Sequence, residues 1–102
     1  MLFLKKRDHT MEISRANAIK DIYGVEEVSE QQCKNFLAIL GDLSDREERI
    51  LRLYYGLDDN KQRSLQDLAN EFGVTRERIR QVISSAIKKL RHPTRSNSVI
   101  GK

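Results

Sequence analysis

The signal that most constrains the fold is a set of helix-start residues, each followed by apolar residues at helical spacing. Ser44 precedes Glu47 by three positions, which is the capping-box pattern in which each side chain satisfies a free backbone N–H of the other residue. Ser29 and Gln32 repeat this pattern upstream. Sustained period-two alternation is nearly absent, so we predict an all-α fold rather than a sheet.

Two helices joined by a very short turn lie in the second half of the chain. Ser64 and Thr75 are cap residues at the starts of these helices. Gly73 lies between the helices and permits a sharp reversal of the backbone, and Pro93 prevents much continuation of the second helix. This spacing predicts a helix-turn-helix over residues 65–91.

The second of these helices has two distinct faces when its residues are placed at about 100° intervals. Apolar residues lie within about 80° of Ile79 and form one stripe: Val82, Ile83, Ala86, Ile87 and Leu90. Polar residues lie on the other side, with Arg76 in the first turn: Glu77, Arg80, Gln81, Ser84 and Lys88. We therefore predict that the apolar stripe packs on the core.

The exposed N-terminal half of this helix carries side chains that suit the edges of DNA bases: Arg76, Glu77, Arg80 and Gln81. Arginine can donate two hydrogen bonds to guanine, glutamine can pair with adenine, and glutamate can accept from cytosine. Lys88, further along, suits phosphate. The alternative is an ordinary solvated surface with weak Glu–Arg pairs. Because the helix follows a capped helix-turn-helix, we favour DNA contact.

Charge is distributed unevenly along the chain. Residues 75–102 hold eight basic and one acidic side chains, whereas residues 21–59 hold ten acidic and four basic ones. The basic segment suits a polyanion, and the acidic segment suits a protein partner or solubility. With 38% hydrophobic and 33% charged residues, we expect a small core built from helix stripes.

Several functional classes lack the residues they require. Cys33 is the single cysteine, which excludes a disulfide within one chain and a cysteine-based zinc site. No nucleophile–base pair, metal cluster or phosphate loop is present, so we predict no catalytic residue, no metal, no cofactor and no enzyme. The apolar start MLFL is too short for a signal segment, and we predict a cytoplasmic protein without membrane contact.

Three segments together resemble region four of the bacterial sigma-seventy family of RNA polymerase sigma factors: LSDREERILRLYYGLDD, SLQDLANEFGVTRERIRQ and AIKKLRHPTRS. The resemblance runs from about Leu43 to Ser96. It implies a small helical bundle containing a helix-turn-helix of the winged-helix-like or region-four type. It further implies binding to the minus-thirty-five promoter element in the major groove and docking on the flap tip of the polymerase β subunit.

The resemblance also assigns roles by matching position. It implies base contacts by the four residues already selected: Arg76, Glu77, Arg80 and Gln81. It implies contacts to the phosphate backbone by four others: Arg46, Ser64, Leu65 and Thr75. The polymerase contact is expected on the acidic first helix of the matching region.

We divide the chain into a helical extension of unknown role (1–42), a DNA-binding domain (43–96) and a flexible tail (97–102). Within the extension, residues 14–23 are a weaker helix candidate, and both chain ends are expected to be mobile arms. The 42 residues before the resemblance hold three aromatic side chains. We therefore expect no region two or three, and no promoter opening by this chain alone.

The favoured function is a transcription factor that binds promoter DNA and RNA polymerase core, encoded by a bacterial chromosome, a phage or a mobile element. It would be a stand-alone region-four protein or one half of a split sigma factor, with a second protein supplying region two. One alternative is an adaptor that competes with sigma factors for the β flap or binds an anti-sigma factor. The other is a simple helix-turn-helix repressor or the DNA-binding arm of a recombinase.

Overall fold

Helices account for nearly all regular structure in the computed structural model, which describes residues 2–101 and the side chains of residues 13–101. No β-strand occurs in residues 2–101, and the predicted all-α fold is confirmed. In chain order the elements are α1 (Leu2–Tyr23), α2 (Glu30–Ile39), the short 3-10 helix η1 (Leu40–Asp42), α3 (Asp45–Tyr55), α4 (Leu65–Phe72), α5 (Arg76–Leu90) and α6 (Pro93–Ile100).

Reciprocal hydrogen bonds start three of the helices. At α3, Ser44 Oγ accepts from the N–H of Glu47 at 3.2 Å, and Glu47 Oε1 accepts from the N–H of Ser44 at 3.1 Å. Two further helices start with the same reciprocal pair: Ser29 with Gln32 at α2, and Ser64 with Asp67 at α4. The predicted caps are therefore confirmed, because these side chains occupy backbone N–H groups that have no partner within the helix.

Two glycines end α3 and α4 in the left-handed conformation. Gly56 has φ +66° and Gly73 has φ +67°, which glycine adopts at little cost. A Cβ at Gly56 would lie 2.7 Å from the backbone of Lys61, whereas one at Gly73 would meet nothing within 4 Å. The turn after α3 therefore needs glycine for both conformation and space, and the turn after α4 for conformation alone.

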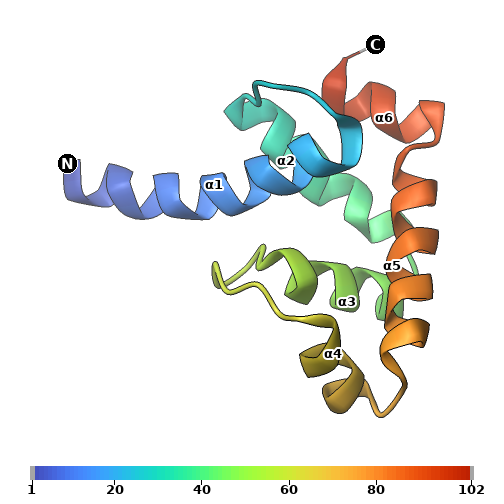
Figure 1. Ribbon diagram of the computed structural model, residues 1–102. Helices are drawn as coiled ribbons and strands as arrows, with labels where there is room; N and C mark the ends of the chain where they lie inside the picture. Colours follow the sequence, from blue (N-terminus) through green and yellow to red (C-terminus); the bar gives the residue numbers. More distant parts are fainter. Residues whose placement is uncertain (1, 102) are drawn as a thin grey trace.

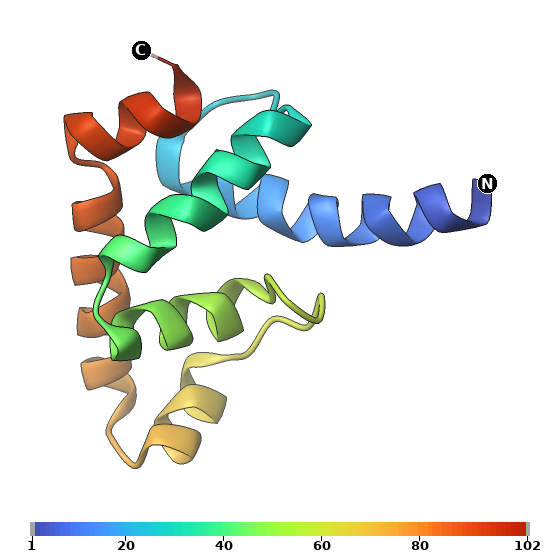
Figure 2. The same cartoon turned by 180° about the vertical axis from the view of Figure 1, so that it is seen from behind.

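Helix α5 runs along one edge of the molecule and connects its two ends (Figures 1 and 2). Helices α3 and α4 pack on α5, while α2 packs on α6. The largest fully buried side chains come from every helix and from the turn after α3: Ile19, Ile22, Phe36, Leu40, Ile50, Leu51, Leu57, Leu68, Ile79, Leu90 and Val99. One continuous core therefore joins both halves of the chain.

Helix α1 differs from the prediction in both length and role. It begins at Leu2 instead of near Ser14, so the predicted mobile arm is helical. No proline or glycine precedes Gly24, so nothing in that segment interrupts a helix. The N-terminal half of α1 projects away from the other helices (Figures 1 and 2). Its other half buries Ile19 and Ile22, so the extension contributes to the core.

Hydrogen bonds hold α1 at the C-terminal end of α5. The hydroxyl of Tyr23 donates to the carbonyl oxygen of Leu90 at 2.8 Å. Arg91 Nε donates to the carbonyl oxygen of Ile22 at 2.7 Å. The functional division into residues 1–42 and 43–96 stays a prediction, but these two ranges share one packed body.

The C-terminal segment also differs from the prediction. Residues 97–100 belong to α6, and Val99 is 1% exposed, whereas the sequence predicted a flexible tail over 97–102. Pro93 suits the first turn of a helix, where its missing N–H is not needed, and His92 caps α6 by accepting a 3.3 Å hydrogen bond from the N–H of Thr94. Lys102 lies outside the described residues.

Candidate nucleic-acid interface

The two faces of α5 agree with the predicted pattern. Five members of the apolar stripe are buried, and Ile87 is partly buried: Ile79, Val82, Ile83, Ala86 and Leu90. The predicted contact residues of α5 are exposed: Arg76, Glu77, Arg80, Gln81 and Lys88. The helix is thus held by one face and presents charged and amide groups on the other.

A hollow of about 420 Å³ lies where the starts of α4 and α5 meet. Its lining combines three predicted base-contact residues with two predicted phosphate-contact residues: Arg76, Glu77, Arg80, Leu65 and Thr75. Both helix starts carry backbone N–H groups and the positive end of a helix dipole. The fold therefore gathers these five residues at a place suited to an anion.

The two helix starts differ in which polar groups are already bonded. At α4, the N–H of Ser64 donates to Asp67 Oδ2 at 3.2 Å, and Ser64 Oγ accepts from the N–H of Asp67 at 3.0 Å. At α5, Thr75 Oγ1 accepts from the N–H of Arg78 at 3.0 Å. Both polar groups of Ser64 are thus used in the cap. The N–H of Leu65 is therefore the better candidate for a phosphate contact at the start of α4.

Two of the predicted base-contact residues bond to each other. Arg80 donates from Nε to Glu77 Oε1 at 3.1 Å and from Nη2 to Glu77 Oε2 at 2.8 Å. The hydrogen bond from Arg80 lowers the pKa of Glu77, and the same hydrogen bond raises the pKa of Arg80. Both side chains therefore stay charged near neutral pH. Glu–Arg pairs were named from the sequence only as the alternative to DNA contact, without the residues that form them.

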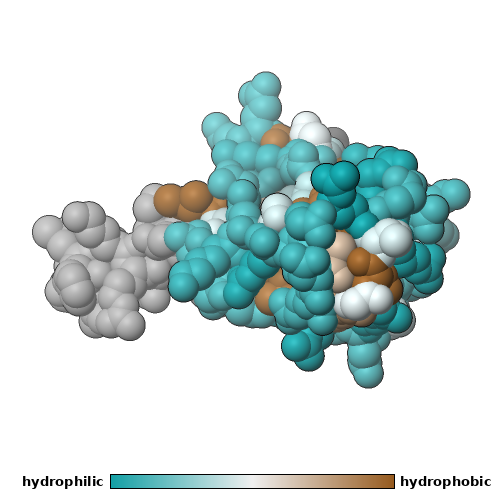
Figure 3. Space-filling model, turned by 60° about the horizontal axis from the view of Figure 1, so that its bottom comes forward, coloured by the Kyte–Doolittle hydropathy of each residue, from teal (hydrophilic) through white to brown (hydrophobic). Residues whose placement is uncertain are grey.

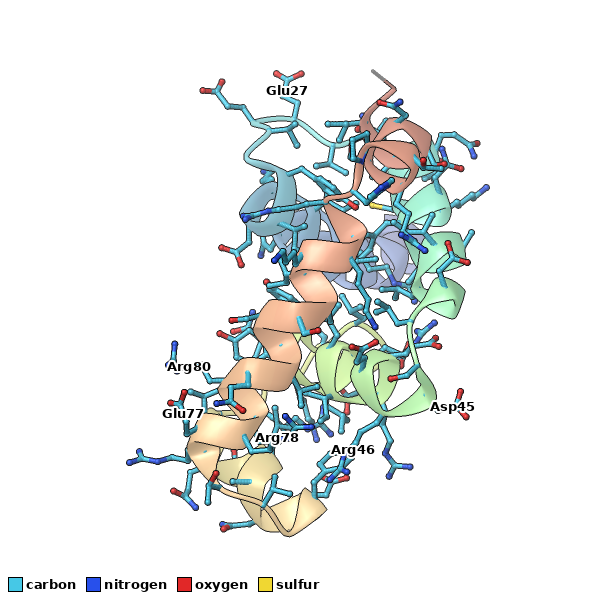
Figure 4. All side chains as sticks on the ribbon, turned by 90° about the vertical axis from the view of Figure 1, so that its right-hand side faces the viewer. Glu27, Asp45, Arg46, Glu77, Arg78 and Arg80 are labelled. Atoms are coloured by element: carbon cyan, nitrogen blue, oxygen red, sulfur yellow. The ribbon has the colours of Figure 1, made fainter. Side chains whose placement is uncertain are left out.

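Cations lie along two edges of α5. Glu77 and Arg80 lie at one edge in Figure 4, whereas Arg78 lies at the other, on the side of Arg46 and α3. Arg78 is exposed, and the sequence analysis did not select it as a contact residue. A helix seated in a major groove has a phosphate backbone on each side, so cations on both edges suit that arrangement.

Arg46 lies away from the hollow, on an aromatic surface. The guanidinium carbons of Arg46 and Arg49 lie 5.9 and 5.7 Å from the ring centroid of Phe72, within the range of cation–π attraction. Arg49 also pairs with Glu71 at 3.5 Å. Phe72 also packs against the core as a partly buried side chain, so the ring contacts the core as well as the two arginines.

Lys88 and Lys89 have different surroundings although they are neighbours in the sequence. Lys89 Nζ lies 3.0 Å from both carboxylate oxygens of Glu47 on α3. Burial acts to raise the pKa of Glu47, but hydrogen bonds from Lys89 and Ser44 outweigh it and leave the pKa below its ordinary value. Lys88 is exposed on the face of α5 that carries Gln81. Lys88 is therefore the better candidate for phosphate contact.

The surface at the α4 end of the molecule is mostly hydrophilic. Figure 3 brings this end forward and shows hydrophobic residues only in small separate patches. Ile13 on α1 is the exposed large hydrophobic residue among the described side chains. Interfaces with DNA are more polar and more positively charged than those between proteins, which agrees with this surface.

Among residues 13–101, no group of three or more His, Cys, Asp or Glu side chains is placed to hold a metal ion. Each helix in the described part of the chain is too short or too polar to cross a lipid bilayer.

These features place the chain in the class of helix-turn-helix proteins. The family model for sigma-70, region 4 matches residues 39–92, more than half of the chain. The chain therefore belongs to the sigma-70 region 4 family, as the resemblance implied. Membership of this family gives it a sigma-factor-like role in DNA binding and transcription.

Curated relatives match the same part of the chain. The RNA polymerase sigma factor SigA of Clostridium acetobutylicum is 52% identical over 66 residues, which are 65% of this chain and 18% of that protein. The RNA polymerase sigma factors SigA of Listeria monocytogenes and Listeria innocua are each 54% identical over 61 residues, which are 60% of this chain and 16% of each relative. The chain thus spans less than a fifth of the length of these relatives.

Proposed function

We propose that this chain binds minus-thirty-five-like promoter DNA and docks on RNA polymerase. The observation that carries the proposal is the hollow at the starts of α4 and α5, which brings predicted base and phosphate contacts together. In this arrangement the N-terminal half of α5 enters the major groove, and the start of α4 approaches the phosphate backbone. The function belongs in the cytoplasm, where promoter DNA and polymerase meet.

Base recognition falls to four exposed side chains of α5: Arg76, Glu77, Arg80 and Gln81. The arginines donate to guanine O6 and N7, the glutamine pairs with adenine, and the glutamate accepts from cytosine N4. Phosphate contacts fall to five residues around them: Arg46, Ser64, Leu65, Thr75 and Lys88. These contacts fix the register of the helix on the duplex without selecting its sequence.

Polymerase docking is proposed for the acidic side of the molecule. The first turn of α3 contains Asp45, Glu47 and Glu48, and the curated relatives are named as RNA polymerase sigma factors. The partner surface is the flap of the β subunit. A second protein that supplies region two, or an anti-sigma factor, would act beside this contact. The chain works as a stand-alone region-four protein or as one half of a split sigma factor.

Footprinting and a pull-down with core polymerase test the two parts separately. The full chain should protect a duplex containing a minus-thirty-five element but not a scrambled duplex, and it should retain core polymerase on beads. Arg80→Ala should require a higher protein concentration to give the footprint. Arg95→Ala is the matched control. Arg95 lies on α6, away from the hollow, and it pairs with Asp42 at 3.2 Å. A chain that binds neither the element nor the polymerase would refute the proposal.

The adaptor alternative gives a different result in the same experiment. An adaptor would retain core polymerase and compete with a sigma factor even after Arg80→Ala, since DNA contact is not required for competition. A repressor would footprint without retaining polymerase, and it would usually be a dimer in solution. Affinity purification from the native cell would identify a separate region-two protein or anti-sigma partner.

A further inference from the structure

Glu77 is the single acidic residue in the basic segment 75–102, and it lies on the surface proposed to meet DNA. Three cations are near it in the sequence: Arg76, Arg78 and Arg80. A carboxylate at this place opposes approach to phosphate, because like charges repel. The core does not require it, since the side chain of Glu77 is 57% exposed and that of Arg80 is 62% exposed.

The pair with Glu77 determines which groups of Arg80 are available. Nε and Nη2 of Arg80 donate to the two oxygens of the carboxylate at 3.1 and 2.8 Å. A guanidinium has five N–H donors in a fixed plane, so donors remain on the edge directed away from Glu77. The pair thus holds the plane of the guanidinium in one orientation. It also neutralises the positive charge of Arg80, which weakens the attraction of Arg80 to a distant phosphate.

Gln81 and Arg78 complete this arrangement. The Gln81 side chain contributes to lowering the pKa of Glu77, and Arg78 Nη1 donates to Gln81 Oε1 at 3.5 Å. In the described chain, the Arg76 side chain forms no hydrogen bond or ion pair. Among the three arginines in the first turns of α5, Arg76 is therefore the one that can meet any DNA without first breaking a contact.

We propose that Glu77 is a specificity-determining residue that acts through Arg80: it penalises DNA that offers only phosphate, and it orients Arg80 for a base edge. This inference rests on the proposed DNA-binding function and names how the same site discriminates. On cognate DNA, a cytosine amino group compensates the carboxylate. On other DNA the carboxylate remains uncompensated beside the phosphates, and the complex is weakened.

The test compares the full wild-type chain with Glu77→Gln on a minus-thirty-five duplex and on a scrambled duplex, across a salt series. Glu77→Gln should bind the scrambled duplex more tightly and reduce the specificity ratio about tenfold. The salt dependence on scrambled DNA should become steeper by about one phosphate contact, because Arg80 is released. Glu77→Asp, which keeps the charge, should restore most of the ratio.

A matched control removes a similar pair elsewhere. Asp42 Oδ2 accepts a 3.2 Å hydrogen bond from Arg95 Nε on α6, so Asp42→Asn also removes one negative charge and one pair with an arginine. It should leave both the ratio and the salt dependence at wild-type values. If Glu77→Gln changes the ratio and the salt dependence no more than Asp42→Asn does, the inference is wrong.

A readout without DNA separates failure of the inference from failure of the proposed function. An NMR pH titration of the free protein should place the pKa of Glu77 below its ordinary value, and Arg80→Gln should raise it. A wild-type chain that lacks sequence preference refutes the proposed function, and with it the role given to Glu77. A wild-type chain with preference and an unchanged Glu77→Gln refutes only the inference. If the titration shows that Arg80 does not lower the pKa of Glu77, the inference is refuted, whichever DNA result is found.

Discussion

The hydroxyl of Tyr55 donates a 2.5 Å hydrogen bond to Oδ2 of Asp21, which joins α3 to α1. Burial is the main cause that raises the pKa of Tyr55, and the hydrogen bond and the negative charge of Asp21 add to it. Asp21 lies before the family match at residues 39–92, and Tyr55 lies within it. The matched segment is therefore bonded to residues that the family model does not cover.

The first prediction concerns the part of α1 that enters the core. Ile19→Ala should lower the free energy of unfolding by about 2–5 kcal/mol, because Ile19 is fully buried and its truncation leaves a cavity. Ile13→Ala on the same helix is the control, since Ile13 is 44% exposed and should change stability by less than about 0.5 kcal/mol. Urea unfolding measures both. Equal effects would show that α1 does not pack as described.

The second prediction concerns alkaline pH. Burial raises the pKa of Tyr23 to about 12 from an ordinary value of 10.0. Because the folded state holds this proton more tightly, the contribution of Tyr23 to stability is complete below pH 10 and is lost as pH rises toward 12. Wild-type urea midpoints should therefore fall more steeply over this range than those of Tyr23→Phe. Parallel curves for the two proteins would contradict the assignment.

The third prediction separates two adjacent lysines. Lys88→Ala should weaken binding to all duplexes alike and reduce the salt slope by about one contact, without changing stability. Lys89→Ala should lower the urea midpoint, because it leaves Glu47, which is 13% exposed, without its cation. Fluorescence anisotropy and urea unfolding give the two readouts. The reverse assignment of effects would place Lys89, not Lys88, at the phosphate backbone.

The fourth prediction concerns base recognition. Arg80→Ala should weaken binding to the cognate duplex by roughly 5- to 150-fold and relax the sequence preference at one base pair. Anisotropy titrations on duplexes with single base changes locate that base pair. Arg95→Ala should leave the preference intact. Tight, selective binding by Arg80→Ala would contradict the proposed seating of α5.

The fifth prediction compares two glycines with the same conformation. Gly73→Ala should cost about 1–2 kcal/mol of stability, which is the penalty for a Cβ at a left-handed residue. Gly56→Ala should cost more, because the new Cβ would also lie 2.7 Å from the Lys61 backbone. Thermal and urea unfolding of both variants check the order. A larger loss at Gly73 would show that the turn of the helix-turn-helix is more crowded than described.

Local signals predicted the central helices well. Ser44, Ser64 and Thr75 each form the cap expected of them, because a cap depends on residues only three positions apart. Gly73 adopts the left-handed turn for the same local reason. The two faces of α5 also followed from spacing alone, since a helix places every residue by its position in the sequence.

Features that depend on distant residues were not predictable in the same way. The sequence 93–100 holds few apolar residues, and its helix is explained by burial of Val99 in a core that includes α2. The pair of Glu77 with Arg80 required the directions of both side chains, which spacing at three residues permits but does not impose. The site residues were therefore identifiable as a set, but their bonds to one another were not.

The two ends of helix α5 have different surroundings. It is an unbroken helix of 15 residues, roughly 22 Å long at about 1.5 Å per residue. The hydroxyl of Tyr23 bonds to Leu90 at one end, and three exposed arginines lie at the opposite end: Arg76, Arg78 and Arg80. A rotation of roughly 5° about the held end would carry Arg76 by about 2 Å, more than a base-edge hydrogen bond tolerates. Because α3 and α4 pack on α5 and Tyr23 bonds to its C-terminal end, these contacts together fix the direction in which the side chains at its N-terminal end point.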